Sequence, residues 1–453
     1  HHVMIYHGTV TFMKNWVSYS LVMSIFIILA LLLSGCTEQA APKSADSIKI
    51  GVVASMSGPA STTGKDIWQS AELAASEINE NGGVYVKELD KKIPIVLVQG
   101  DDESTREGGI RAVTKLITQD KSDLLIGGYS SAVVSAHQSI IANEKIPYII
   151  SGGSSTSVSR RDDIDTSYMF FHRPSTDDSA KAVVLFIHEV VRPEIYKKFN
   201  LPEDRPLRLA LLLQDSPFGK GQQTGVLNLI KELNLPIEMV SEATFKMGES
   251  DFRTALTSIK TKNPDIIYAV TFLNELIPLT QQARRDIGLN TLIIAGENND
   301  DPDYYSGVGE YGDFTLMESR FSPYAIPKGT TYETTEKFLE NFKNKYGGFA
   351  GMMGAAAYES VYIAKKAIED AGTVQKGAVQ KTLSEISMDH MMEVMKDGLI
   401  QFSPDYRESS FVLYVEQMRM DEAAGEIRPH IVWPESIRET GFVIPDWYQP
   451  GSA

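Results

Sequence analysis

Hydroxyl-bearing side chains follow three of the strands that the sequence predicts in the first half of the chain. They lie within residues 57–64, 129–131 and 154–156, where serine and threonine are frequent. Because the carboxyl ends of parallel strands meet at one edge of a sheet, we expect these segments to form one polar rim. Hydroxyls and the free amides of helix N-termini bind carboxylates, so the rim suits a small polar ligand.

The same segment offers a remote alternative, a serine hydrolase. Residues 128–132 approach the Gly-X-Ser-X-Gly pattern of a nucleophile elbow, but Ala132 replaces the last glycine. His137 and His172 are possible bases, although their spacing gives no support for a triad. The plain structural interpretation is that Ser131 caps the helix that it opens.

Residues 297–303 form the densest polar cluster of the chain. A calcium-binding loop that begins at Asn299 would need glycine at its sixth position, where the chain has Tyr304. The cluster therefore fits a polar turn better than a metal loop, and we expect no metal site and no cofactor.

Cys36 is the only cysteine of the chain, so no disulfide can form within it. It follows an apolar run at residues 17–33 and the small residues Ser34 and Gly35, and Lys14 precedes the run. This layout is typical of a secretory signal peptide that ends in a lipobox, where the cysteine thiol is lipidated. The alternative is an uncleaved signal anchor in which the cysteine is incidental.

We interpret the N-terminal region as three parts. Residues 1–12 are upstream sequence that we leave out of the fold, residues 13–35 are a lipoprotein signal peptide, and residues 36–47 are a flexible tether. The protein is then expected outside the cytoplasm, anchored to the cell membrane through lipidated Cys36.

Composition limits the class of the remaining domain. About 400 residues exceed one typical domain and suggest two lobes. The net charge of −16 argues against a nucleic-acid partner, which would require a basic surface. A hydrophobic content of 43% is ordinary for a globular protein.

Strand and helix signals alternate along this domain, which predicts an α/β fold of two doubly wound lobes with parallel-rich sheets. A late strand is expected at residues 411–415, and the tail beyond it is expected to pack along the surface. The earlier strands are expected at residues 48–54, 93–98, 124–126 and 146–150, and then at 207–213, 239–245, 265–270 and 292–295.

Several ordered motifs span nearly the whole domain. They are Ser57-Gly58-Pro59, residues 74–84, residues 126–131, Ile146-Pro147, Gln282-Ala283-Arg284 and residues 357–362. In this order they resemble extracytoplasmic solute-binding proteins of the leucine/isoleucine/valine-binding type, which have the type I periplasmic-binding-protein fold. The resemblance implies two lobes joined by three crossovers, with a ligand cleft between them. It places residues 48–172 and 323–407 in the N-terminal lobe, and residues 173–322 and 408–448 in the C-terminal lobe.

The resemblance also assigns roles to individual residues. It places the hydroxyl that meets a ligand carboxylate at Ser131, and further contacts after the next strand at Ser154 and Thr156. The acid that accepts a ligand ammonium falls on Glu297. Each residue has a plain structural alternative, since serine and threonine also occupy caps and turns, and Glu297 could cap the turn that follows it.

Aromatic side chains of the second lobe fall on Phe218 and Phe272 in the same resemblance, although Phe218 could belong to the lobe core. A tyrosine that some family members carry in the first lobe is absent near Thr63. The pocket for the ligand side chain is therefore expected to differ from theirs.

The resemblance implies a binding protein, and not an enzyme, that delivers a small polar solute to an ABC permease in the membrane. It favours an amino acid of the branched-chain type. A ligand-sensing receptor component of the same fold is one alternative, and a binder of urea, an amide or a carboxylate is another.

Overall fold

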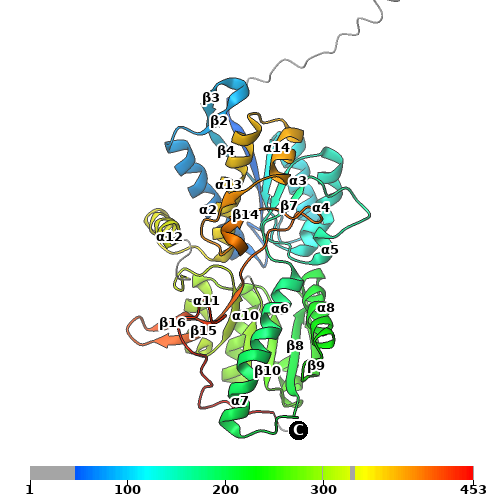
Figure 1. The fold of residues 1–453 in the computed structure, drawn as a ribbon, viewed down its shortest axis with the longest axis vertical. Coiled ribbons are helices and arrows are strands. Elements are labelled where there is room, and N and C mark those ends of the chain that lie inside the picture. The colour runs from blue at the N-terminus through cyan, green and yellow to red at the C-terminus, as the bar shows by residue number, and fades with distance from the viewer. Residues whose placement is uncertain (1–45, 298, 327–331, 452–453) are drawn as a thin grey trace, which may run out of the picture. The chain divides into compact units, whose positions relative to one another are not determined.

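The computed structural model describes residues 46–297, 299–326 and 332–451. Its framework consists of two separate parallel-rich sheets, each covered by helices (Figure 1). The predicted signal peptide, Cys36 and nearly all of the tether lie outside the described residues. None of the described helices is long and apolar enough to cross a membrane.

The first sheet is fully parallel, and its strands follow the order β4-β1-β5-β6-β7. The strands are β1 (Ile48–Ala54), β4 (Ile95–Asp101), β5 (Leu124–Gly127), β6 (Tyr148–Ile150) and β7 (Met169–Phe171). The main covering helices are α2 (Ser61–Glu80), α3 (Arg106–Thr118), α4 (Ser131–Glu144) and α13 (Met352–Ala371). Helix α2 packs against α13, and α3 packs against α4. Late chain segments therefore complete the first lobe.

The second sheet has the order β16-β15-β12-β11-β10-β8-β9. Its first five strands along the chain are parallel, and β15 and β16 join antiparallel. The strands are β8 (Leu207–Gln214), β9 (Ile237–Phe245), β10 (Ile266–Val270), β11 (Leu292–Ala295), β12 (Leu316–Ser319), β15 (Tyr414–Asp421) and β16 (Glu426–Trp433). The helices of this lobe include α6 (Thr176–Phe186), α8 (Pro217–Glu232), α9 (Arg253–Lys260), α10 (Leu273–Gln281) and α11 (Pro302–Val308).

Smaller elements complete the described part of the chain. The helices are α5 (Thr156–Ser159), α7 (Arg192–Phe199), α12 (Tyr332–Tyr346) and α14 (Lys376–Ser384). The short strands are β2 (Val84–Val86), β3 (Lys91–Ile93), β13 (Met388–Asp389) and β14 (Leu399–Ile400). Single 3₁₀ or π turns are η1 (Lys87–Leu89), η2 (Ile187–Val191), η3 (Gln282–Asp286), η4 (Gly309–Gly312) and η5 (Lys396–Gly398).

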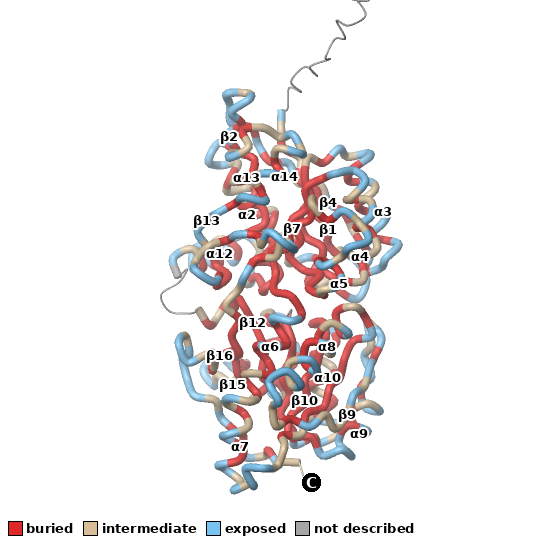
Figure 2. Tube along the Cα trace, turned by 45° about the vertical axis from the view of Figure 1, so that its right-hand side comes forward, coloured by how far each residue is buried: buried red, intermediate tan, exposed pale blue. Residues whose placement is uncertain are grey.

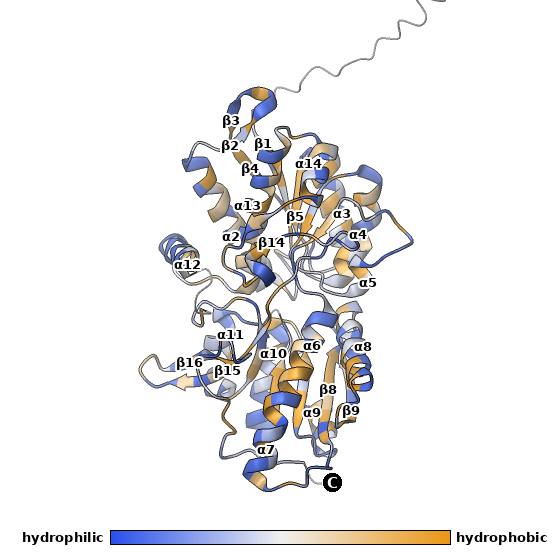
Figure 3. Ribbon diagram, viewed as in Figure 1, coloured by the Kyte–Doolittle hydropathy of each residue, from blue (hydrophilic) through white to orange (hydrophobic). Residues whose placement is uncertain are grey.

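Each sheet has its own apolar core, and buried residues concentrate on the strands (Figure 2). Strands such as β5 and β8 are strongly hydrophobic, whereas the outer helix faces carry polar side chains (Figure 3). This is expected where helices cover both faces of a parallel sheet, because the strands are then buried on both sides.

Three segments lead from one sheet to the other, after β7, after β12 and before β15. The first and third lie side by side, since the Phe171 N–H donates to the Arg407 carbonyl at 2.8 Å and the Ser409 N–H donates to the Phe171 carbonyl at 2.9 Å. The predicted fold class is confirmed, whereas the predicted lobe boundaries stay predictions. The late strand is β15, which begins at Tyr414 and is longer than expected, and its hairpin partner β16 was not predicted.

A glycine lies in the first turn of the helix that follows the first strand of each sheet. A Cβ atom added at Gly64 of α2 would come within 1.9 Å of the Ser55 carbonyl oxygen. A Cβ at Gly219 of α8 would come equally close to the Gln214 carbonyl oxygen. Both helices can therefore start directly against the end of their strand, which places their first turns at the sheet edge.

We expect Gly64→Ala to lower the free energy of unfolding by about 1–3 kcal/mol, because overpacked positions force the backbone to shift. Gly441→Ala is a matched control, since nothing lies within 4 Å of the added carbon. Urea unfolding of both variants measures the difference. Equal stability of the two variants would contradict the claim that α2 needs a glycine at position 64 to begin directly against β1.

Candidate functional site

Two of the predicted hydroxyl segments meet at the carboxyl edge of the first sheet. Ser131 is buried at the first residue of α4, and its Oγ accepts a hydrogen bond from the Ser155 N–H at 3.2 Å. Gly127 and Gly128 both have positive φ, which lets the chain turn sharply from β5 toward this helix. The turn brings the end of β5 against the end of β6, as the predicted polar rim requires.

Ser154 and Thr156 follow β6 and contact the start of the second lobe. The Ser154 carbonyl accepts a hydrogen bond from the Thr176 N–H at 2.9 Å, and the Thr156 N–H donates to Thr176 Oγ1 at 3.4 Å. Ser154 is buried, whereas Thr156 is only half-buried. The loop after β6 is thereby fixed to the first turn of α6.

Glu297 follows β11 and is 1% exposed. Its Oε2 accepts a hydrogen bond from Arg320 Nη1 at 3.1 Å, while Oε1 has no hydrogen-bond partner among the described residues. Burial raises the pKa of Glu297, and the Arg320 charge and the Ser154 hydroxyl act in the opposite direction. The carboxyl group thus keeps one free acceptor oxygen in a buried place.

The sequence analysis missed Arg320, which follows β12 and is buried. Its Nη2 donates to the Ser151 carbonyl at 3.2 Å, and its Nε donates to Glu393. A charged residue directly after a wholly buried strand is a signal that could have marked it. Arg320 therefore connects the loop after β6 with the acid that follows β11.

Phe218 and Phe272 lie together, with ring centroids 6.0 Å apart and ring planes at 22°. Tyr129, which was not assigned a role, packs on Phe272 at 4.5 Å between centroids. All three rings are buried. Since Tyr129 follows β5 and Phe272 follows β10, this aromatic contact joins the edges of the two sheets.

Other contacts across these edges support the same arrangement. Asn274 donates a side-chain hydrogen bond to the Pro59 carbonyl, and Gly248 lies beside the Pro59 ring. The described structure therefore has the two sheet edges in contact, with Ser131, Ser154 and Glu297 buried between them.

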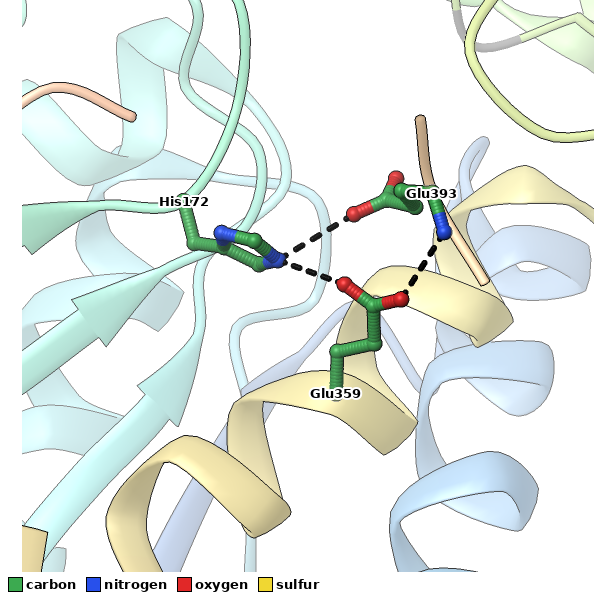
Figure 4. Close-up of side chains that lie close together, drawn as sticks. All are labelled: His172, Glu359 and Glu393. Carbon is green, nitrogen blue, oxygen red and sulfur yellow. Dashed lines mark hydrogen bonds and ion pairs between the residues drawn. The ribbon is translucent and has the colours of Figure 1, made fainter. Parts of the chain in front are cut away.

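A group of buried titratable residues lies next to this site (Figure 4). His172 Nε2 is 2.8 Å from Glu359 Oε2 and 3.2 Å from Glu393 Oε2, and all three side chains are fully buried. Burial alone would lower the pKa of His172, but hydrogen bonds and charge attraction from the two glutamates raise it to about 9. The imidazole is therefore a cation at neutral pH.

The three residues also have donor atoms within 4.8 Å of one another, a spacing that suits a metal ion. The backbone N–H groups of Met392 and Glu393 donate to Glu359 Oε1, and Arg320 donates to Glu393. These partners make the group a hydrogen-bonded ion-pair cluster.

The geometry gives no support for the hydrolase alternative. Among the described residues, no hydrogen bond joins Ser131 to His137 or His172. Burial lowers the pKa of His137 to about 3, and the His172 ring is held by two glutamates.

Comparisons with known proteins agree with this architecture. A family described as periplasmic binding protein matches residues 47–416. The "Leu/Ile/Val-binding protein homolog 7" of Brucella abortus (strain 2308) is 24% identical over 368 residues, covering 80% of this chain and 86% of that protein. The "homolog 8" of the same strain is 25% identical over 308 residues, covering 66% of this chain and 70% of that protein.

Two solved structures share the fold. LivJ of Streptococcus pneumoniae, a branched-chain amino acid transporter substrate-binding protein in complex with isoleucine, superposes with a TM-score of 0.69 at 21% identity, covering 86% of this chain and all of that one. A solute-binding protein of an ABC transporter from Rhodopseudomonas palustris BisB5, in complex with 3,4-dihydroxybenzoic acid, gives a TM-score of 0.70 at 16% identity over 85% of this chain and 96% of that one.

We expect stability to fall as the pH rises from about 6.5 to about 9. His172 has a folded pKa of about 9 against an unfolded value near 6.5. The ion pairs of His172 therefore contribute fully to the free energy of unfolding below its unfolded pKa. This contribution is lost as the pH rises through its folded pKa. Urea unfolding across this range should show a smaller fall in His172→Gln than in the parent protein. If the free energy of unfolding depends on pH in the same way in both proteins, this would argue against a charged His172.

Proposed function

Because the chain belongs to the periplasmic binding protein family, we propose that it captures a small solute between its two lobes for an ABC transporter. Membership of this family implies a location outside the cytoplasm. The observation that carries the proposal is the set of buried polar groups at the facing sheet edges. Ser131, Ser154 and Glu297 are almost fully buried, and Glu297 Oε1 has no hydrogen-bond partner among the described residues, which supports a polar ligand as its partner.

We propose an amino acid with an apolar side chain, of the branched-chain type, as the ligand. The Ser131 hydroxyl and the amides that begin α4 would bind its carboxylate, with Ser154 and Thr156 beside them. The free Oε1 of Glu297 would accept its ammonium group. Phe218 and Phe272 would border its side chain.

An aromatic carboxylate is the second candidate. Two observations favour it: Arg320 already neutralises Glu297 in part, and three aromatic rings cluster at the contact between the sheets. Urea or an amide would also find hydrogen-bond partners in the site but would leave the aromatic cluster without an apolar partner.

We further propose that Cys36 carries a lipid that holds the protein at the membrane beside a permease. The support for this is the order of the leader, with a basic start, an apolar run and small residues before the thiol. A receptor component that reports the ligand instead of delivering it would use the same cleft.

A thermal-shift screen tests the ligand class. We expect L-leucine or L-isoleucine to raise Tm, because a ligand present at one hundred times its Kd stabilises the folded state by about 2.7 kcal/mol. Benzoate and urea are the comparison compounds. A rise with benzoate alone would favour the aromatic carboxylate and contradict the amino-acid proposal.

Glu297→Gln tests the ammonium site. We expect the affinity for the amino acid to fall by about 2–5 kcal/mol, or at least about thirtyfold in Kd, because the ligand charge would lose its buried partner. Glu238→Gln makes the same chemical change at an exposed position of β9 and should leave Kd unchanged. Titration calorimetry measures both variants, and an unaltered Kd in Glu297→Gln would remove this role.

A further inference from the structure

Five buried charged residues form one continuous network beside the candidate ligand site. In order of contact they are Glu359, His172, Glu393, Arg320 and Glu297. His172 lies between the first two glutamates, Arg320 Nε donates to Glu393, and Arg320 Nη1 donates to Glu297 Oε2. No side chain of this buried charge network is more than 1% exposed.

The network reaches from one sheet to the other. Glu359 belongs to α13, which packs on the first sheet, and Glu297 follows β11 of the second. His172 and Arg320 lie in two of the segments that connect the sheets. His172 and the Glu393 backbone N–H link Glu359 to Glu393, and Arg320 links Glu393 to Glu297.

The charges of the network do not balance. When all five groups are ionised, three carboxylates face two cations, so one negative charge has no partner within the network. A net charge is costly to bury, so it attracts either a proton or an external cation. Burial raises the pKa of both Glu297 and Glu359. Of these two, Glu297 lies at the candidate ligand site, and its Oε1 has no hydrogen-bond partner among the described residues, so it can accept such a group there.

Neighbouring charges do not remove this deficit. Burial raises the pKa of Glu318 well above its usual value, which favours the protonated form of this side chain. Arg173 is paired with Glu408 at 3.1 Å. Asp178 also acts on Glu297, but it is exposed and caps α6 together with Ser175. Among the titratable groups that act on Glu297 from the surrounding elements, Arg320 therefore supplies the main compensating charge.

We propose that a proton and the cationic group of the ligand compete for this one uncompensated charge, so that Arg320, Glu393 and His172 are positioning residues that set ligand affinity without touching the ligand. The inference rests on the proposed function, since it requires a ligand that carries an ammonium group. On binding, a carboxyl O–H bond breaks, its proton passes to water, and the carboxylate forms an ion pair with the ammonium.

Calorimetry with L-leucine tests the competition in the unaltered protein. Heats of binding measured in phosphate and in bis-Tris, at a pH near 6, should differ because up to about one proton per ligand is released to the buffer. The association constant should rise with pH by up to about tenfold per unit until the carboxyl is fully ionised. Binding of 4-methylpentanoate, which lacks the ammonium group, should show neither effect.

Glu393→Gln tests the positioning role. The network would then hold two carboxylates and two cations, so we expect L-leucine to bind about tenfold or more weakly and with a flatter pH profile. Asp265→Asn is the matched control, because Asp265 is a fully buried carboxylate paired with Arg205 at the opposite edge of the second sheet. It should lower stability without altering the pH profile of binding.

The possible failures are distinct. Leucine that binds without proton release, or with the same pH profile in Glu393→Gln, contradicts this inference and leaves the proposed function standing. Failure of every amino acid to bind contradicts both. If Glu393→Gln does not fold, the two-buffer measurement on the unaltered protein still decides the outcome.

Discussion

The position of Arg320 is the constraint on which the rest of the site depends. One guanidinium group contacts an acid of each lobe and a backbone carbonyl of the loop after β6. Buried ions are stable only when their partners are in place, and removal of one partner leaves an uncompensated charge. The loop after β6, the end of β11 and the segment around Glu393 must therefore keep their relative positions wherever Arg320 is buried.

The two lobes share one local feature at the edges that face each other. In each, a glycine in the first helical turn lets the helix begin directly against the preceding strand end, at Gly64 and at Gly219. Free backbone amides and short polar side chains then lie at the edge of the sheet, where the other lobe faces them. The aromatic contact between Tyr129 and Phe272 closes the apolar side of the same edge. Both sheet edges thus contribute polar and aromatic side chains to the region where they meet.

The parts of this structure that follow from local patterns could be predicted. Apolar runs alternating with helical spacing gave both sheets, because a buried parallel strand needs an unbroken hydrophobic sequence. Hydroxyl-rich strand ends placed Ser131 and Ser154 at one edge, because all parallel strands end on the same side. The second strand of the β15–β16 hairpin was not predicted, because Pro429 lies inside it and a proline argues against a strand in the sequence.

The charge network could not be predicted in this way. His172, Arg320, Glu359 and Glu393 are separated by up to 221 positions, and no local spacing of the sequence indicates that they meet. Only the packing of the late helix α13 on the first sheet brings Glu359 to His172. Pairing over such distances depends on the whole topology, which a single sequence does not encode in any local spacing.

The network also determines how strongly Glu297 can bind a proton or a cation. A solitary buried carboxylate would be protonated or would bind a cation strongly, whereas one fully matched by an arginine would bind no cation. Glu297 lies between these cases, because Arg320 is shared with Glu393 and its charge is divided between two acids. Under the proposed function, the affinity of the site for a cationic group would then be set by Glu393 and His172 as well as by the residues that contact the ligand. A change of ligand class could therefore arise at Glu393 or His172 with the proposed contact residues unaltered.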